Sequence, residues 1–249
     1  MIKHRLDIEL TKRGLTGSRS QAESWIKLGK VTVDGTTITK SGHFVRDDSV
    51  IKLTASEQYV SRAGLKLASV SVALKLDFRG KIVLDVGSST GGFTDYALKH
   101  GARKVYAVDV GTDQLHPSLR ANRAIELHEK TDIRDFVIDS ELPDIVVIDV
   151  SFISLREILP HVATHLASSL TQVVAMVKPQ FEAQRRQLGS SGVIKNDTMR
   201  RTILKDFEVW SKQYFVIVDK ADSEVHGARG NQERFYLLKP LGNKKSLSP

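Results

Sequence analysis

The segment KIVLDVGSSTGGF, residues 81–93, joins an apolar run, a turn of small residues and the start of a helix. The run is rich in β-branched side chains and carries one acid, Asp85, near its end. The glycines of the turn allow positive φ angles and let a ligand approach the backbone closely. Strand, glycine turn and helix in this order build the first nucleotide-binding crevice of a doubly wound sheet. We therefore expect an α/β protein with a ligand over this turn.

The turn also discriminates between nucleotide ligands. A dinucleotide fingerprint starting at Gly87 needs a second glycine where this chain has Ser89. Asp85 would repel a phosphate, whereas it suits a cationic ligand such as S-adenosylmethionine, which carries an ammonium and a sulfonium. Asp109 ends the next apolar run, KVYAVDV, where it can accept hydrogen bonds from a ribose diol. These features favour adenosylmethionine over the alternative, an ordinary α/β turn without a ligand.

Composition narrows the class of partner. The 249 residues include 37 Lys and Arg against 29 Asp and Glu, a net charge of +8, which favours a polyanion such as nucleic acid or an anionic membrane. The absence of cysteine excludes disulfides and thiolate metal sites. No apolar run approaches the roughly 20 residues of a membrane span, and the segment MIKHRLDIEL does not resemble a signal peptide. We expect a cytoplasmic protein without stable membrane association.

Residues 1–57 are expected to form a separate small α+β domain. Two helices, each ended by a glycine, precede a β-hairpin with the favoured Asp34-Gly35 turn. The stretch RLDIELTKRGLTGSRSQAESWIKLGKVTVDGTTITKSGHFV resembles the αL-type RNA-binding domain of small-subunit ribosomal proteins and pseudouridine synthases. The alternative is a protein-docking domain whose charges form a solvated face. The candidate RNA-binding residues are Arg13, Arg19, Lys27, Lys30 and Lys40, with Arg62 at the start of the next domain.

Beyond a linker at residues 54–60, strand and helix patterns alternate through a second domain, residues 58–242. They predict a Rossmann-like, mostly parallel seven-stranded sheet with helices on both faces. The expected strands are residues 81–86, 104–110, 124–129, 144–150, 171–177, 214–220 and 234–239. The expected helices are residues 93–100, 154–167 and 197–212, with another after Ser61 that carries Lys66. The final residues, GNKKSLSP, are predicted to be a disordered tail.

Chemistry in an open α/β sheet takes place beyond the carboxyl ends of the strands. Asp149 and Lys178 end neighbouring buried strands there, so they should face each other, either as a structural ion pair or as catalytic groups. A lysine with a depressed pKa can remove the proton of a ribose 2′-hydroxyl that attacks a sulfonium methyl. The neighbouring carboxylate would raise that pKa, so we expect a second cation nearby.

The segments SRAGLKL, VLDVGSSTGGFTDYAL, VYAVDVGTDQLH, IVVIDVSFISL, VKPQFE and GARGNQERF resemble the TlyA family. These are ribosomal RNA 2′-O-methyltransferases related to FtsJ-type enzymes and often named hemolysins. The resemblance implies a methyltransferase sheet, S-adenosylmethionine as the cofactor, ribosomal RNA or ribosomal subunits as partners, and a cytidine ribose as the acceptor. It implies a catalytic set of Lys66, Asp149, Lys178 and Glu233, with Lys178 as the base. It implies donor contacts from Asp85, Gly87, Ser89, Gly91, Gly92, Phe93, Thr94, Asp109 and Asp132.

Several features fit this family less well or leave alternatives open. Ala228-Arg229 stands where a proline-lysine pair is common, and His226 just upstream is unusual. His161 and His165 lack the glutamate of a zinc protease, so no metal site is expected. The basic loop at residues 184–192 is either an RNA-contacting lid or a solvated connection. Two other functions compete with methyl transfer, namely a non-catalytic RNA-binding or ribosome-assembly factor and a membrane-active cytolysin.

Overall fold

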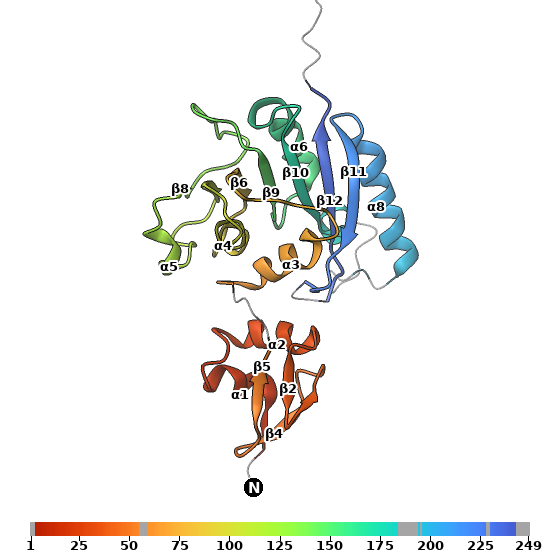
Figure 1. Cartoon of the computed structure of the whole chain (residues 1–249). Coiled ribbons are helices and arrows are strands. Elements are labelled where there is room, and N and C mark those ends of the chain that lie inside the picture. The colour runs from red at the N-terminus through yellow and green to blue at the C-terminus, as the bar shows by residue number, and fades with distance from the viewer. Residues whose placement is uncertain (1–2, 55–58, 184–193, 195, 228–229, 243–249) are drawn as a thin grey trace, which may run out of the picture.

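The computed structural model describes residues 3–54, 59–183, 194, 196–227 and 230–242. Figure 1 shows a small N-terminal domain joined to a larger α/β domain. The expected loop at residues 184–192, the pair Ala228-Arg229 and residues 243–249 of the tail lie outside the described residues, as do residues 55–58 of the linker. In the part of the chain that is described, no helix is both long and apolar enough to cross a bilayer.

The N-terminal domain contains the two expected helices and the expected hairpin. Asp34 and Gly35 have φ angles of 49° and 82°, so both are left-handed, as the tight hairpin turn requires. The hairpin pairs through β2 with β5, and β1 pairs with β4, which the sequence did not indicate. The elements are β1 (Lys3–Arg5), α1 (Leu6–Lys12), α2 (Arg19–Lys27), β2 (Val31–Val33), β3 (Thr36–Thr37), β4 (Phe44–Arg46) and β5 (Ile51–Leu53).

The start of α2 also connects the two domains. The hydroxyl of Ser18 accepts a hydrogen bond from the backbone N–H of Gln21 (3.2 Å), which caps the helix as predicted. The side chain of Gln21 accepts from Gly17 N (2.8 Å) and donates to the carbonyl of Tyr59 (2.6 Å). The buried Tyr59 ring lies 5.3 Å from the ring of Tyr96 in the α/β domain. One side chain of α2 therefore fixes the chain where it enters the second domain.

The second domain is built on a seven-stranded sheet, which confirms the predicted fold class. Its strand order is β11-β12-β10-β9-β6-β7-β8, and β12 is antiparallel to both its neighbours while the other pairs are parallel. The strands are β6 (Ile82–Val86), β7 (Lys104–Val108), β8 (Ile125–His128), β9 (Ile145–Ile148), β10 (Gln172–Val177), β11 (Phe215–Asp222) and β12 (Arg234–Pro240). The chain runs outward from β6 to β8 and then crosses back to β9. The switch point of the sheet therefore lies between β6 and β9, where ligands of such folds bind.

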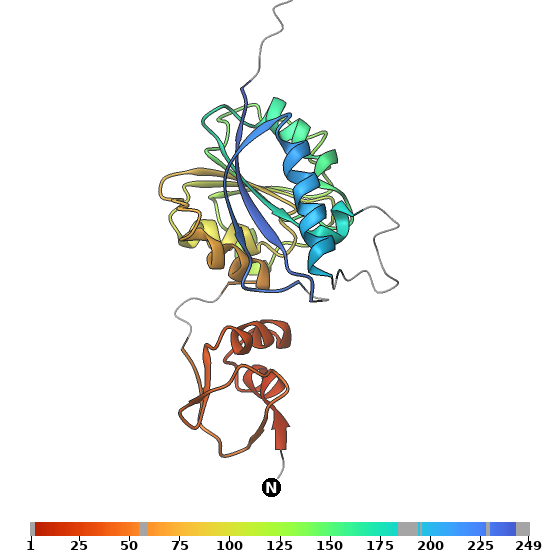
Figure 2. The same cartoon turned by 90° about the vertical axis from the view of Figure 1, so that its right-hand side faces the viewer.

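Helices cover both faces of this sheet (Figure 2). Side chains alternate between the faces along each strand, so Val83 packs in one core and Leu84 in the other. The first core includes α3 and α4, and the second includes the segment at 155–166 and α8. The helices are α3 (Arg62–Ser71), α4 (Gly92–Lys99), α5 (Pro117–Arg120), α7 (Pro179–Glu182) and α8 (Asp197–Ser211).

The single helix expected at residues 154–167 was wrong. The chain there forms a 3₁₀ turn at Leu155–Glu157, a short α6 at Leu159–His161 and a π turn at Val162–Leu166. Pro160 has no backbone N–H, so it cannot make the helical hydrogen bond to the residue four positions earlier. An apolar stripe alone did not reveal this interruption.

Candidate active site

The glycine turn after β6 packs closely against the backbone at the end of β9. Gly87 has a φ of 78°, and a Cβ there would lie 2.8 Å from the carbonyl oxygen of Asp149. Asp109, just after β7, accepts hydrogen bonds from Ser89 N (2.8 Å) and Gly111 N (2.7 Å). The turn is therefore fixed by contacts with the ends of two neighbouring strands. Both the lack of space for a Cβ and the positive φ angle require glycine at position 87.

Asp85 lies beneath the turn and is 1% exposed. Its Oδ2 accepts hydrogen bonds from Thr94 N (2.9 Å) and Thr94 Oγ1 (2.6 Å). Its Oδ1 is buried and has no hydrogen-bond partner among the described residues. Burial raises the pKa of Asp85 to about 7, against the lowering effect of Thr94. A buried acceptor without a donor is the feature that a cationic group, such as the ammonium of S-adenosylmethionine, would complete.

Three of the expected donor contacts have a packing role in this structure. A Cβ on Gly91 would meet the side chains of Leu115 and Leu119, and one on Gly92 would overlap the hydroxyl of Ser61. Thr94 is fully buried, with its hydroxyl on Asp85. None of the three lines either of the two cavities described next. Their direct contact with a donor stays a prediction.

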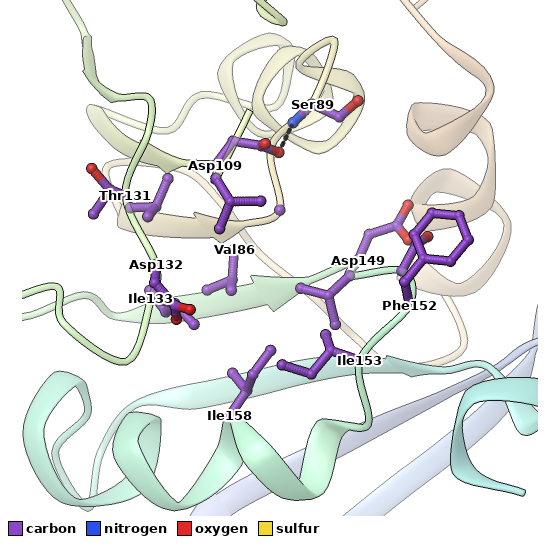
Figure 3. A pocket seen from close by; sticks show the side chains of 15 residues that line it. Val86, Ser89, Asp109, Thr131, Asp132, Ile133, Asp149, Phe152, Ile153 and Ile158 are labelled. Carbon is purple, nitrogen blue, oxygen red and sulfur yellow. Dashed lines mark hydrogen bonds between the residues drawn. The ribbon is translucent and has the colours of Figure 1, made fainter. Parts of the chain in front are cut away.

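A cavity of about 350 Å³, here called the strand-end cavity, opens beyond the ends of β6, β7 and β9. Its lining includes Gly87, Ser89 and Asp109, as well as Asp132. Figure 3 shows Thr131 and Asp132 at one end of this cavity and Asp149 and Phe152 at the other. Asp132 accepts hydrogen bonds from Arg134, which lower its pKa. The volume and the mixed apolar and polar lining suit a nucleoside.

Asp149 and Lys178 face each other, as the strand ends predicted. Lys178 Nζ lies 2.6 Å from Asp149 Oδ1 and donates to Ser151 Oγ at 2.8 Å. The lysine side chain is 9% exposed and the aspartate 15%. Within the described structure, Lys178 is the only polar partner of Asp149 Oδ1. The amine is thus held by two oxygens at the point where the chain leaves β10.

A second lysine–carboxylate pair joins α3 to the start of β12. Lys66 Nζ lies 2.5 Å from Glu233 Oε2, and both side chains are almost fully buried. The backbone beside Glu233 is braced from α8, because Arg200 donates to the carbonyl of Gln232 (3.1 Å). The structure therefore brings the four residues of the expected catalytic set together as two pairs.

Lys66 and Lys178 line one cavity of about 420 Å³, here called the interhelix cavity. It lies between the start of α3 and the turn before α4, and it shares Gly87, Ser89 and Asp149 with the strand-end cavity. Asp85 and Phe93 also line it, and Ser18 of the N-terminal domain lies at its edge. The two cavities together form one site, because Lys178 of the interhelix cavity contacts Asp149 and Ser151, which line both cavities.

Phe152 is a site residue that the sequence analysis did not single out. Its side chain is 91% exposed, its φ is 69°, and its ring lies 5.4 Å from that of Phe181. A bulky residue rarely adopts a positive φ, and such strain concentrates at functional sites. Its position directly after Ser151 was the available signal, but the sequence does not reveal the backbone angle.

The expected RNA-binding residues divide into three groups. Arg13 donates to Glu9 and to the carbonyls of Asp47 and Ser49, and Arg19 binds Asp7, so both have partners inside the domain. Arg62, at the start of the second domain as expected, lines the interhelix cavity. The remaining three are exposed, namely Lys27, Lys30 and Lys40.

Another basic face lies on the paired strands β1 and β4. The cross-strand partners Lys3 with Arg46 and Arg5 with Phe44 share one side, because directly opposite residues point the same way. Phe44 is 60% exposed, whereas Val45 on the other side is buried. Residues 43–46, HFVR, do not alternate between polar and apolar side chains, so the sequence contains no period-2 signal for this strand.

Comparison with known proteins identifies relatives of both domains. The family model for FtsJ-like methyltransferases matches residues 59–239, and that for the S4 domain matches residues 4–51. Hemolysin A of Brachyspira hyodysenteriae is 41% identical over 235 residues, which cover 92% of this chain and 97% of that protein. The protein of Mycobacterium tuberculosis (strain ATCC 25618 / H37Rv) named 16S/23S rRNA (cytidine-2'-O)-methyltransferase TlyA is 38% identical over 240 residues, 94% and 89% of the two chains. A solved structure of a hemolysin-named protein from Streptococcus thermophilus covers 96% of this chain and 89% of its own, with a TM-score of 0.71 and 38% identity.

Proposed function

Because the chain belongs to the FtsJ-like methyltransferase family, and within it to the TlyA family, we propose that it methylates a ribose 2′-hydroxyl of ribosomal RNA with S-adenosylmethionine as the donor. The expected acceptor is a cytidine. We assign methyl transfer to residues 58–242 and RNA binding to residues 1–57, the part that the S4 family model matches over residues 4–51. A ribosomal substrate would place the reaction in the cytoplasm.

The observation that carries this proposal is the pairing of two buried lysines with two carboxylates beside an acid that lacks a partner. The pairs are Lys178 with Asp149 and Lys66 with Glu233, and the incomplete acid is Asp85. Burying two lysines is costly, and the cost is offset only when each charge has a close partner. Buried charged groups that converge on a cavity of this kind are typical of an active site.

The positions of the site residues support a separate role for each in methyl transfer. S-adenosylmethionine, when bound, supplies an electrophilic methyl group on its sulfonium. Lys178 is the group that accepts the proton of the 2′-hydroxyl, and Asp149 and Ser151 orient its Nζ. Lys66, held by Glu233, is the second cation beside the attacking oxygen. The exposed ring of Phe152 at the cavity offers a stacking face for an unpaired RNA base.

The expected donor contacts follow from the strand ends. Asp109 keeps acceptor capacity for a ribose diol beside its two backbone hydrogen bonds. Asp132 lines the far end of the strand-end cavity, where we assign it to the adenine. Gly87 lets the donor approach the backbone, since it has no side chain at the narrowest point of the turn.

The test is transfer of labelled methyl from S-adenosylmethionine to purified ribosomal subunits. Lys178→Ala is expected to lower turnover by about 10²- to 10⁴-fold, the usual contribution of a general base, with donor affinity retained. The matched control is Lys220→Ala, which removes an exposed ion pair with Glu208 on the surface and is expected to leave turnover within about twofold. Near-normal turnover of the Lys178 variant would reject this residue as the base. Absence of both transfer and donor binding in the unsubstituted protein would reject the enzyme and favour an RNA-binding factor.

A further inference from the structure

The backbone at Phe152 is the strained point of the candidate active site. Its φ of 69° lies in the left-handed region, which a bulky residue rarely adopts, and its side chain is 91% exposed. Such a conformation persists only where the surrounding structure over-determines it. An exposed ring has little packing of its own, so the residues on either side of Phe152 must hold the conformation.

The carboxylate of Glu182 anchors the chain just after Phe152. Its Oε2 accepts a hydrogen bond from Ser154 Oγ (2.7 Å), and its Oε1 accepts one from Leu155 N (2.7 Å). Its side chain is 1% exposed, and the Nε of Arg156 lies 3.6 Å from Oε2. Burial raises the pKa of Glu182 in spite of these partners, so the charged carboxylate is costly in this place. A costly acid beside an active site is a candidate for a role in the reaction.

Glu182 is also connected to the proposed base. It is the last residue of α7, the short helix that starts directly after Lys178, and Phe181 N donates to the carbonyl of Lys178 (2.9 Å). Lys178 in turn donates to Ser151 Oγ (2.8 Å), on the other side of Phe152. The ring of Phe152 lies between these two anchors, 5.4 Å from the ring of Phe181. One turn of helix therefore holds both flanks of the strained residue.

The segment held in this way forms one wall of the strand-end cavity. Phe152 and Ile153 both line the cavity, and Figure 3 shows them at the end where Asp149 lies. Without the anchor at Glu182, the backbone at Phe152 is free to return to a common conformation, because nothing else fixes the chain on that side. The exposed ring would then leave its place beside the partner of Lys178.

We propose that Glu182 is a positioning residue for methyl transfer, which holds Phe152 in the left-handed conformation so that the ring stacks on a base of the RNA at the strand-end cavity. This inference rests on the proposed function, since that function supplies the RNA acceptor. Glu182 acts through Phe152 and touches neither the methyl donor nor the ribose. Its effect is therefore on the RNA side of the reaction, and the affinity for S-adenosylmethionine does not depend on it.

The test is a double-mutant cycle of Glu182→Ala and Phe152→Ala in the full-length protein, with methyl transfer to ribosomal subunits as the reaction. Phe152→Ala is expected to lower kcat/KM for the subunits by about 10- to 100-fold, the factor that stacking of a base on an aromatic ring contributes. Glu182→Ala is expected to lower it about tenfold, and the doubly substituted protein to lose no more than Phe152→Ala alone. Calorimetry is expected to give an affinity for S-adenosylmethionine within about twofold of the unsubstituted protein in all three.

Two further variants separate positioning from folding. Glu182→Gln keeps an oxygen that accepts from Leu155 N and an amide that can donate to Ser154 Oγ, so kcat/KM is expected to stay within about threefold. The matched control is Glu208→Ala, which removes a partly buried acid that accepts a hydrogen bond from Tyr236 Oη (2.9 Å). It is expected to lower the denaturation midpoint and to leave kcat/KM within about twofold.

Other results would overturn the proposal. Losses in the two single variants that multiply in the doubly substituted protein would show that Glu182 and Phe152 act independently. An unchanged kcat/KM in either single variant, or a fall in donor affinity that accounts for the loss, would equally reject the assigned role. If Glu182→Ala does not fold, Ser154→Ala takes its place in the cycle with an expected loss of about 3- to 10-fold. Absence of transfer by the unsubstituted protein would instead reject the proposed function, and this inference with it.

Discussion

Asp7 in the N-terminal domain and Asp85 in the α/β domain are both fully buried aspartates with opposite surroundings. Asp7 accepts hydrogen bonds from Arg5 (3.0 and 2.8 Å), Arg19 (2.9 Å) and Ile8 N (3.0 Å). Burial raises its pKa, but the two arginines outweigh that effect and lower it to about 2. Among the residues that the structure describes, Asp85 accepts hydrogen bonds from Thr94 alone, and burial raises its pKa to about 7. Two equally buried aspartates therefore differ in their hydrogen bonding, which is complete for Asp7 and incomplete for Asp85.

This difference distinguishes buried acids that stabilise the fold from buried acids that bind a ligand. A buried carboxylate whose lone pairs are all used stabilises the fold, whereas one that lacks a donor destabilises it until a ligand binds. Burial does not distinguish the two cases, and neither does residue type. The missing hydrogen-bond donor at Asp85 does distinguish the two cases, and it lies in the cavity where we place S-adenosylmethionine.

Asp85→Asn is expected to give the largest change in the stability of the ligand-free protein. The folded pKa of about 7 lies above the ordinary value of 3.8, so the unfolded state binds fewer protons and the protein loses stability as pH rises from about 4 to 7. Asparagine removes this cost, and the free energy of unfolding should increase by up to about 4 kcal/mol at pH 8. The gain should vanish near pH 4. Urea denaturation at pH 4, 6 and 8 measures it, and a loss of stability at pH 8 would show that Asp85 is a structural acid like Asp7.

Asp7→Asn should have the opposite sign. It leaves Arg5 and Arg19 without their shared acceptor, and we expect a loss of about 2–3 kcal/mol at pH 7, less than for a fully buried pair because both arginines are about half exposed. The stabilisation by Asp7 is present above pH 3.8 and is lost as pH falls towards 2. The exposed pair of Asp77 with Arg79 provides the control, since Asp77→Asn should leave the denaturation midpoint unchanged. Equal effects of the two substitutions would remove the contrast between buried and exposed acids.

Glu233 extends the comparison to an acid with a single lysine partner, and Gly227→Ala tests it. Gly227 has an ordinary φ angle, but a Cβ there would lie 2.8 Å from Glu233 Oε1. The carboxylate must then shift against Lys66, and we expect about a tenfold loss of turnover, roughly 1.4 kcal/mol, with little change in stability. Gly230→Ala in the same loop meets no atom within 4 Å but has a φ of 90°, so it should lower stability by about 1 kcal/mol and keep the activity. Loss of activity in both variants would show that any disturbance of the loop lowers turnover, whether or not it displaces the Glu233 carboxylate.

The sequence predicted those parts of the molecule that depend on local pattern. The apolar run at residues 82–86 and the glycine turn after it predicted β6 and the crevice. The neighbouring strand ends predicted that Asp149 and Lys178 lie together. The capping of α2 and the Asp34-Gly35 hairpin were equally local. Each of these features needs only a strand period, a helix cap or a turn residue.

The features that the pattern missed depend on contacts between distant segments or on backbone angles. Glu233, just before the last strand, reaches Lys66 on α3, and only the family resemblance placed it in the catalytic set. Arg62 lines a cavity, and the local sequence does not distinguish this position from an exposed surface. Pro160 divided an expected helix, and Phe152 took a positive φ that no propensity indicates.

The most direct test of the account is the chemical identity of the product. Ribosomal subunits incubated with the protein and S-adenosylmethionine would be digested to nucleosides, and the methylated nucleoside identified by mass spectrometry against synthetic standards. The account predicts 2′-O-methylcytidine, formed by the unsubstituted protein and by Lys220→Ala but lost in Lys178→Ala. A cytosine methylated on the base, or 2′-O-methylation that persists in Lys178→Ala, would contradict it.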